Sequence, residues 1–251
     1  MDLPRRSSHL GQWADGGSHG PLTGPLAQFI GVGLIVAAAV WLGLAALTGT
    51  RWSEAIAWGL GAYAGTAALA TFGLGTSFPH RLIGLCNVIT LTRLGLTGIL
   101  FAALFTSAIG AWTIFAIAAL AFALDGADGW FARRSGLTSE FGARFDMEVD
   151  SVLALTLSIL AFQSGAGAYV LILGVPRYAF GAANLIWPWL GGPLPERFSR
   201  KVVCVLQIAT LLCALLPWAP QAVVQMMVSL SALALVWSFW VDIQALKRAR
   251  S

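Results

Sequence analysis

Four aspartates stand at fixed intervals in a short, mostly apolar part of the chain, which reads DGADGWFARRSGLTSEFGARFDMEVD. They are Asp125, Asp128, Asp146 and Asp150. Ionisable side chains inside apolar spans are costly, and by default they mark a functional site. Four carboxylates that converge cannot all stay ionised without strong positive compensation. Mg²⁺, Mn²⁺ and Ca²⁺ are hard cations that bind aspartate oxygens, so the segment predicts a metal site.

The spacing divides these aspartates into two pairs. Asp125 and Asp128 are three residues apart and share one face of a helix, and Asp146 and Asp150 share a face because they are four apart. The connection 132–144 folds the chain back, so we expect the two pairs to meet. Two metals bridged by shared carboxylates suit a phosphate or diphosphate substrate. The alternative is that the aspartates cap helices or pair with Arg133, Arg134 and Arg144.

Small and basic residues accompany the two pairs. Gly129 and Gly142 lack side chains, which lets a ligand or a neighbouring backbone approach closely. Arg133 lies about two helical turns beyond Asp125 and can reach an anionic ligand at the metals. Arg144 precedes the second pair and is a candidate contact for an acceptor or a diphosphate. Its alternative is an orienting charge at the membrane surface.

The composition indicates how these residues are positioned. The chain has 251 residues, of which 58% are hydrophobic and 10% charged, whereas soluble domains carry about 25% charged residues. We therefore predict an all-α, polytopic membrane protein with about eight transmembrane helices. The expected spans are 26–47, 54–75, 88–107, 110–131, 145–163, 167–188, 202–217 and 221–244.

The basic residues predict the orientation of these spans. With eight spans, the basic clusters fall on one side, and the opposite connections carry only Arg51. The orienting residues are Arg5, Arg6, Arg81, Arg93, Arg133, Arg134, Arg144, Arg197, Arg200, Lys201, Lys247, Arg248 and Arg250. We expect a bacterial inner or plasma membrane, with the aspartates and both termini cytoplasmic. The net charge of +4 arises from charges that flank apolar runs, so no nucleic-acid partner is expected.

The aspartate segment resembles the signature of the CDP-alcohol phosphotransferases, also called CDP-alcohol phosphatidyltransferases, D-x2-D-G-x2-A-R-x8-G-x3-D-x3-D. The matching positions are Asp125, Asp128, Gly129, Ala132, Arg133, Gly142, Asp146 and Asp150. The run NVITLTRL at 87–94 is similar to the family's N-x-I/L-T-x-x-R segment. The resemblance implies a polar tail over 1–24, a two-helix addition over 25–78 and a six-helix core over 79–251.

The resemblance also implies a reaction. Such enzymes of phospholipid biosynthesis transfer a phosphatidyl or similar group from a CDP-alcohol, such as CDP-diacylglycerol, to an acceptor hydroxyl and release CMP. Asp125, Asp128 and Asp146 would hold two divalent ions, Mg²⁺ or Mn²⁺. Asp150 would lie near the second metal and act as the general base for the acceptor.

Further roles follow from the same resemblance. Gly129 and Arg133 would contact the CDP part of the donor. Asn87 and Thr90 would line the nucleotide pocket. The partners implied are a CDP-linked lipid donor, a small polar acceptor alcohol, the lipid bilayer and a second copy of the chain in a homodimer.

Three other basic residues are candidates for binding the acceptor. Arg177 lies within the expected span 167–188, where a charge is not expected to face lipid. We interpret it as a cation for a phosphate or carboxylate, and the alternative is a pair with an acid such as Glu148. Arg200 and Lys201 stand where the family often has a basic helix entry, which favours an anionic acceptor. Equally, they are orienting charges that contact anionic lipid headgroups.

Two rival functions remain. A secondary transporter could use the acidic cluster to bind protons or cations, although such proteins often show internal repeats and broken helices at mid-membrane. A non-catalytic protein that binds a CDP-lipid is the other rival. The presence of Asp150 argues against it.

Overall fold

The computed structural model describes residues 24–77, 83–135, 139–192 and 197–250, and side chains at 72–77, 127–135, 140 and 249–250 lie outside the description. The elements are α1 (Pro25–Thr48), α2 (Glu54–Ser77), α3 (Gly84–Ala103), α4 (Ala111–Ser135), α5 (Glu140–Ala161), η1 (Phe162–Ala166), η2 (Ala168–Leu173), α6 (Pro176–Ile186), η3 (Pro188–Gly191), α7 (Phe198–Ala214) and α8 (Gln221–Arg250). All regular elements in these ranges are helical, which confirms the all-α class. The predicted tail 1–24 lies almost wholly outside the described residues.

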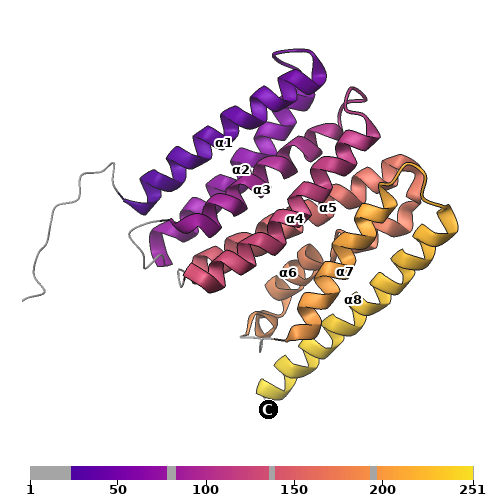
Figure 1. Ribbon diagram of the computed structural model, residues 1–251. Helices are drawn as coiled ribbons and strands as arrows, with labels where there is room; N and C mark the ends of the chain where they lie inside the picture. The colour runs from indigo at the N-terminus through magenta and orange to yellow at the C-terminus, as the bar shows by residue number, and fades with distance from the viewer. Residues whose placement is uncertain (1–23, 78–82, 136–138, 193–196, 251) are drawn as a thin grey trace, which may run out of the picture.

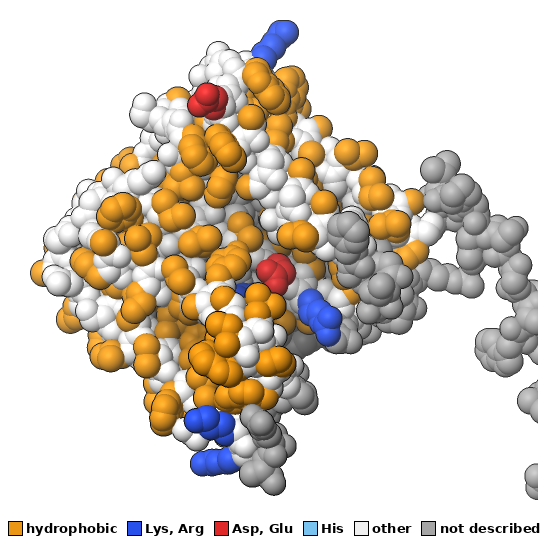
Figure 2. All heavy atoms as spheres, turned by 180° about the vertical axis from the view of Figure 1, so that it is seen from behind, with side chains coloured by type: hydrophobic (Ala, Val, Ile, Leu, Met, Phe, Trp, Pro, Cys, Tyr) orange, Lys and Arg blue, Asp and Glu red, His pale blue; other side chains and the backbone are white. Residues whose placement is uncertain are grey.

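Three helices in the described ranges are long and apolar enough to cross a membrane: Pro25–Thr48, Gly84–Ala103 and Gln221–Arg248. Large apolar side chains such as Leu34, Leu69 and Leu185 lie exposed on the outside. Figure 2 shows a face that is largely hydrophobic, with few charged side chains. Exposed apolar surface on this scale suits contact with lipid and indicates an integral membrane protein. The remaining spans of the predicted eight stay a prediction.

The structure differs from the expected single span at 167–188. A 3₁₀ helix, η2, ends at Leu173 and the short α6 begins at Pro176, so two separate helices occupy this range, and a π-helical turn, η1, directly precedes it. Gly165 and Gly167 have φ of 97° and 87°, which favours glycine and interrupts a right-handed helix. Pro176 stands at the start of α6, where its missing N–H costs no helical hydrogen bond.

Helix α3 lies among α1, α2, α4 and α5 and packs against all four (Figure 1). Its approach to α2 is close, since a Cβ atom added to Gly59 would lie 2.7 Å from the carbonyl oxygen of Gly98. Small residues at such crossings let helix backbones approach in membrane proteins. Helix α3 also packs against α5.

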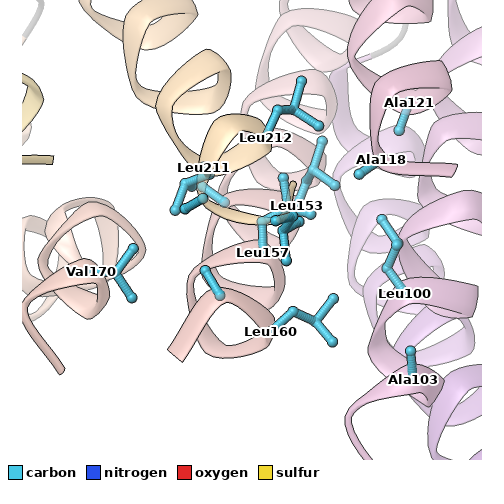
Figure 3. Close-up of a cluster of buried hydrophobic side chains, with 14 of the residues drawn as sticks. Leu100, Ala103, Ala118, Ala121, Leu153, Leu157, Leu160, Val170, Leu211 and Leu212 are labelled. Atoms are coloured by element: carbon cyan, nitrogen blue, oxygen red, sulfur yellow. The ribbon is translucent and has the colours of Figure 1, made fainter. Parts of the chain in front are cut away.

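A core of leucine and alanine side chains holds α5 against its neighbours (Figure 3). Leu153, Leu157 and Leu160 of α5 lie in the cluster with Leu100 of α3 and Leu211 of α7. Burial of such side chains from water contributes about 1.5–3 kcal/mol each, whereas in lipid close packing supplies most of the attraction. This core fixes the helix whose first turns carry Asp146 and Asp150.

Candidate metal centre

The start of α5 is defined by a side-chain cap. Ser139 is extended, with φ −137° and ψ 150°, and its Oγ accepts a 3.0 Å hydrogen bond from the N–H of Gly142. A Cβ atom added to Gly142 would lie 3.2 Å from Oδ1 of Asn87 on α3. The glycine therefore admits a close neighbour, as the sequence predicted, and that neighbour is a side chain of α3. The cap sets the register of Asp146 and Asp150.

Three of the four predicted carboxylates come together. Asp125 projects from α4, and Asp146 and Asp150 project from α5. One carboxylate oxygen of each lies within 4.8 Å of the others. Their side chains are 31%, 34% and 42% exposed, in that order, so the cluster is accessible from solvent. Three hard oxygen donors fit Mg²⁺ or Mn²⁺ by their chemistry.

Arg93 of α3 lies between these carboxylates, with its side chain only 1% exposed. Its Nη2 lies 2.9 Å from Oδ1 of Asp125, and its Nη1 lies 2.5 Å from Oδ1 of Asp146. Nη2 also donates to Oδ1 of Asp150. The guanidinium fork suits several carboxylate oxygens at once. One side chain thus ties three helices together.

Arg93 is predicted from the sequence to be an orienting charge at the membrane surface, and the structure corrects this interpretation. A buried charge is stable only when it is paired, and α4 and α5 supply the partners. The signal in the sequence was the spacing of Asn87, Thr90 and Arg93 at three-residue intervals, which places them on neighbouring positions of one helix face.

The formal charges also fit a cation site. Asp125, Asp146 and Asp150 together carry three negative charges when ionised, and Arg93 supplies one positive charge. The cluster therefore keeps a net negative charge after Arg93 is counted. Each carboxylate has two oxygens, so an oxygen that accepts from Arg93 leaves a second one to bind a metal.

The other residues of the signature lie on α4 beyond Asp125. Asp128, Gly129 and Arg133 fall within the helix, which continues to Ser135. The backbone therefore keeps Asp128 one turn after Asp125, as the spacing predicted. The side chains of Asp128 and Arg133 lie outside the described residues, so their predicted contacts stay predictions.

Asn87 and Thr90 lie on α3 near Arg93, and both are buried. The Oγ1 of Thr90 donates to the carbonyl oxygen of Cys86 at 3.0 Å. The Nδ2 of Asn87 donates to the carbonyl oxygen of Ile83. Asn87 and Thr90 thus lie on the same helix as Arg93, which contacts the carboxylates. Their predicted contact with the nucleotide stays a prediction.

Arg177, at the start of α6, forms an ion pair with Glu148 of α5. This is the alternative that the sequence analysis gave for it. The two side chains are 42% and 52% exposed, so the pair lies at the surface of the protein. Arg144 on α5 is also exposed. Binding of an acceptor by Arg177 and Arg144 stays a prediction.

Arg200 is held by an acid that is not among the predicted site residues. Its Nε and Nη2 lie 3.2 and 3.0 Å from the two carboxylate oxygens of Asp242 on α8. Nη1 of Arg197 lies 3.3 Å from Oδ1 of Asp242. Asp242 is buried, and a lone acid within the last apolar run could have indicated this pair. Lys201 is exposed.

The comparison with protein families gives one match. A family model described as CDP-alcohol phosphatidyltransferase matches residues 83–240, which is more than half of the chain. The matched segment includes Arg93, the aspartates and Arg177, and it leaves out α1 and α2. The comparisons with curated proteins and with solved structures gave no match.

Proposed function

Because this chain belongs to the CDP-alcohol phosphatidyltransferase family, we propose that it transfers a phosphatidyl group from CDP-diacylglycerol to the hydroxyl group of an acceptor alcohol and releases CMP, as a step in phospholipid biosynthesis. The observation that carries this proposal is the convergence of Asp125, Asp146 and Asp150 from α4 and α5. A diphosphate donor carries negative charge, and a carboxylate cluster tolerates such a donor only when cations lie between them.

The proposed cofactors are two divalent ions, Mg²⁺ or Mn²⁺. Asp125, Asp128 and Asp146 would hold them, with Asp150 near the second ion. When bound, such ions neutralise the diphosphate and orient the bond that breaks. The support for this assignment is the set of hard oxygen donors within 4.8 Å of one another.

Asp150 is proposed as the general base. It takes the proton of the acceptor hydroxyl, the acceptor oxygen bonds to the phosphorus that carries diacylglycerol, and the bond from this phosphorus to the CMP oxygen breaks. The Oδ1 of Asp150 accepts from Arg93, which fixes the carboxylate. Oδ2 is the oxygen that we assign to the proton.

The nucleotide part of the donor is assigned to residues of α3 and α4. Gly129 and Arg133 would contact CDP, with Arg133 pairing with a phosphate. Asn87 and Thr90 would line the nucleotide pocket. Their support is position, since Asn87 and Thr90 precede Arg93 by two turns and one turn of α3.

The acceptor is proposed to be a small, polar and anionic alcohol. Arg177 and Arg144 are the first candidates to bind it, and Arg200 and Lys201 are the second pair. The support is that Glu148, the partner of Arg177, lies on α5, two residues after Asp146. Arg177 therefore lies beside the helix that supplies the proposed base.

The proposal also covers the side of the membrane on which the reaction takes place and the oligomeric state. The core of 79–251 would carry the reaction at the cytoplasmic face of the membrane, with both termini on the same side. The lipid donor would enter from the bilayer and the acceptor from the cytosol. A homodimer would be the working unit.

A panel of acceptors tests the proposal. Purified protein in detergent receives CDP-diacylglycerol, Mn²⁺ and one of glycerol phosphate, inositol phosphate, inositol or serine. We expect one acceptor to give a lipid product with one CMP for each product molecule, and we expect an anionic acceptor to exceed its neutral counterpart. Failure of every acceptor to release CMP would contradict the proposed reaction.

A further inference from the structure

Two adjacent residues of α1, Gln28 and Phe29, contact the beginnings of α3 and α5. The N–H of Ile83, just before α3, donates to Oε1 of Gln28 at 3.3 Å. The ring of Phe29 lies edge-on to two rings of α5, with centroids 5.9 Å from Phe141 and 5.5 Å from Phe145. Phe29 is 1% exposed. These contacts link α1 to the segment that matches the family.

The contacted face of α5 lies next to the face that carries the carboxylates. Phe141, Phe145 and Val149 recur every four residues, and all are buried in one cluster with Phe29. Asp146 and Asp150 each follow a member of this row directly, which places them about 100° further around the helix. A rotation of α5 that relaxed the aromatic row would therefore displace both carboxylates.

The aromatic contact is suited to fix this rotation. Phe141 and Phe145 stack on each other with centroids 5.9 Å apart and planes 19° apart, and Phe29 meets both rings edge-on. Edge-to-face pairs are directional, and closely packed side chains leave little room for a shift. Helix α1 makes few other contacts with α5, whereas α2 and α3 also pack against that helix.

We propose that α1 is a positioning element of the carboxylate cluster and that Phe29 is its positioning residue, because it fixes the rotation of the first turns of α5. The effect on catalysis rests on the proposed function, whereas the effect on α5 does not. A misplacement of about 1 Å at a reacting group can cost about 100-fold in rate. Helix α1 is then part of the working enzyme.

The chain offers a matched control on the same helix. Leu44 is fully buried, and it lies about four turns after Phe29 in a different cluster, next to Gly59 of α2. Phe29→Ala and Leu44→Ala both remove a buried apolar side chain and leave a cavity. Only the first removes a contact with the aromatic row of α5. Phe29→Leu keeps apolar volume and loses the edge-on geometry.

Hydrogen exchange of the purified, metal-free protein tests the positioning directly. For Phe29→Ala we expect the amides of 141–150 to exchange at least about tenfold faster, while Leu44→Ala leaves their rates unchanged. Phe29→Leu should give an intermediate rise and serves as the test if the alanine variant does not fold. Unchanged rates in Phe29→Leu and Phe29→Ala, or an equal rise in Leu44→Ala, would overturn the proposal.

Binding of Mn²⁺, followed by electron paramagnetic resonance well below the unfolding temperature, gives the second readout. We expect Phe29→Ala to bind about tenfold more weakly, as for supporting residues around metal ligands, and Leu44→Ala to bind as the parent does. Equal Mn²⁺ affinity in the parent and in both Phe29 variants would overturn the proposal. A parent that binds no Mn²⁺ and releases no CMP would overturn the proposed function instead, and hydrogen exchange would then still decide the role of Phe29.

Discussion

Asp125 of α4 and Asp150 of α5 contact the same nitrogen atom, Nη2 of Arg93. The shared donor fixes the distance between two helices that follow each other in the chain. The guanidinium of Arg93 holds the carboxylate oxygens in place, and its single positive charge does not cancel the charge of three ionised carboxylates. We interpret Arg93 as the residue that keeps the carboxylates together before the metals bind.

The first prediction concerns Arg93. Arg93→Gln leaves the carboxylates without their partner, and breaking a buried ion pair typically costs about 3–5 kcal/mol. We expect a loss of stability of about 3 kcal/mol, the lower end of this range, since the aspartates are partly exposed. We expect Mn²⁺ to raise the unfolding temperature of the variant more than that of the parent, because the ion replaces the lost positive charge. Thermal unfolding in detergent, with and without Mn²⁺, measures both effects.

Arg93→Lys is the matched variant for this prediction. Lysine keeps the charge and lacks the planar fork that contacts several oxygens at once. Its stability should fall between those of the parent and of Arg93→Gln. Parent-like stability in Arg93→Gln, with no added effect of Mn²⁺, would show that Arg93 does not hold the cluster.

The second prediction concerns the proposed base. Asp150→Asn removes the proton acceptor while it keeps the shape of the side chain. We expect CMP release to fall by at least about 100-fold, the lower end of general-base contributions, whereas binding of CDP changes little. Stopped-time assays of CMP and calorimetric titration with CDP measure the two effects. Turnover close to that of the parent would exclude Asp150 as the base.

The third prediction separates the two interpretations of Arg177. Its pair with Glu148 is exposed, so loss of the pair should change stability by less than about 1 kcal/mol. If Arg177 binds an anionic acceptor, Arg177→Ala raises the KM for that acceptor and leaves the KM for CDP-diacylglycerol unchanged. Glu148→Gln breaks the same pair and is the control. An equal rise of KM in both variants would mean that Arg177 acts only through the pair.

Local features of the chain could be predicted from the sequence. Asp146 and Asp150 share a face because a four-residue spacing has the same meaning in any helix. High hydropathy indicated helices over most of the length. Hydropathy does not register where a helix breaks, however, and the break between η2, which ends at Leu173, and α6, which begins at Pro176, interrupts the expected span at 167–188.

Contacts between distant residues could not be predicted in the same way. Arg93 and Asp150 are 57 residues apart, and Arg200 and Asp242 are 42 apart. Spacing carries no information over such separations, because tertiary packing decides which helix faces meet. The position of Arg93 in the sequence therefore indicates an orienting charge. The structure instead buries Arg93 and pairs it with three carboxylates.

The metal dependence of CMP release tests the central claim most directly. Purified protein is stripped with a chelator and then given CDP-diacylglycerol, the acceptor panel, and Mg²⁺ or Mn²⁺. Asp125→Asn is the matched variant, because it removes one charge from the cluster. We expect CMP only when metal and acceptor are both present, and the variant should need at least about tenfold more metal. Cation flux across proteoliposomes without any release of CMP would contradict the account and favour a transporter.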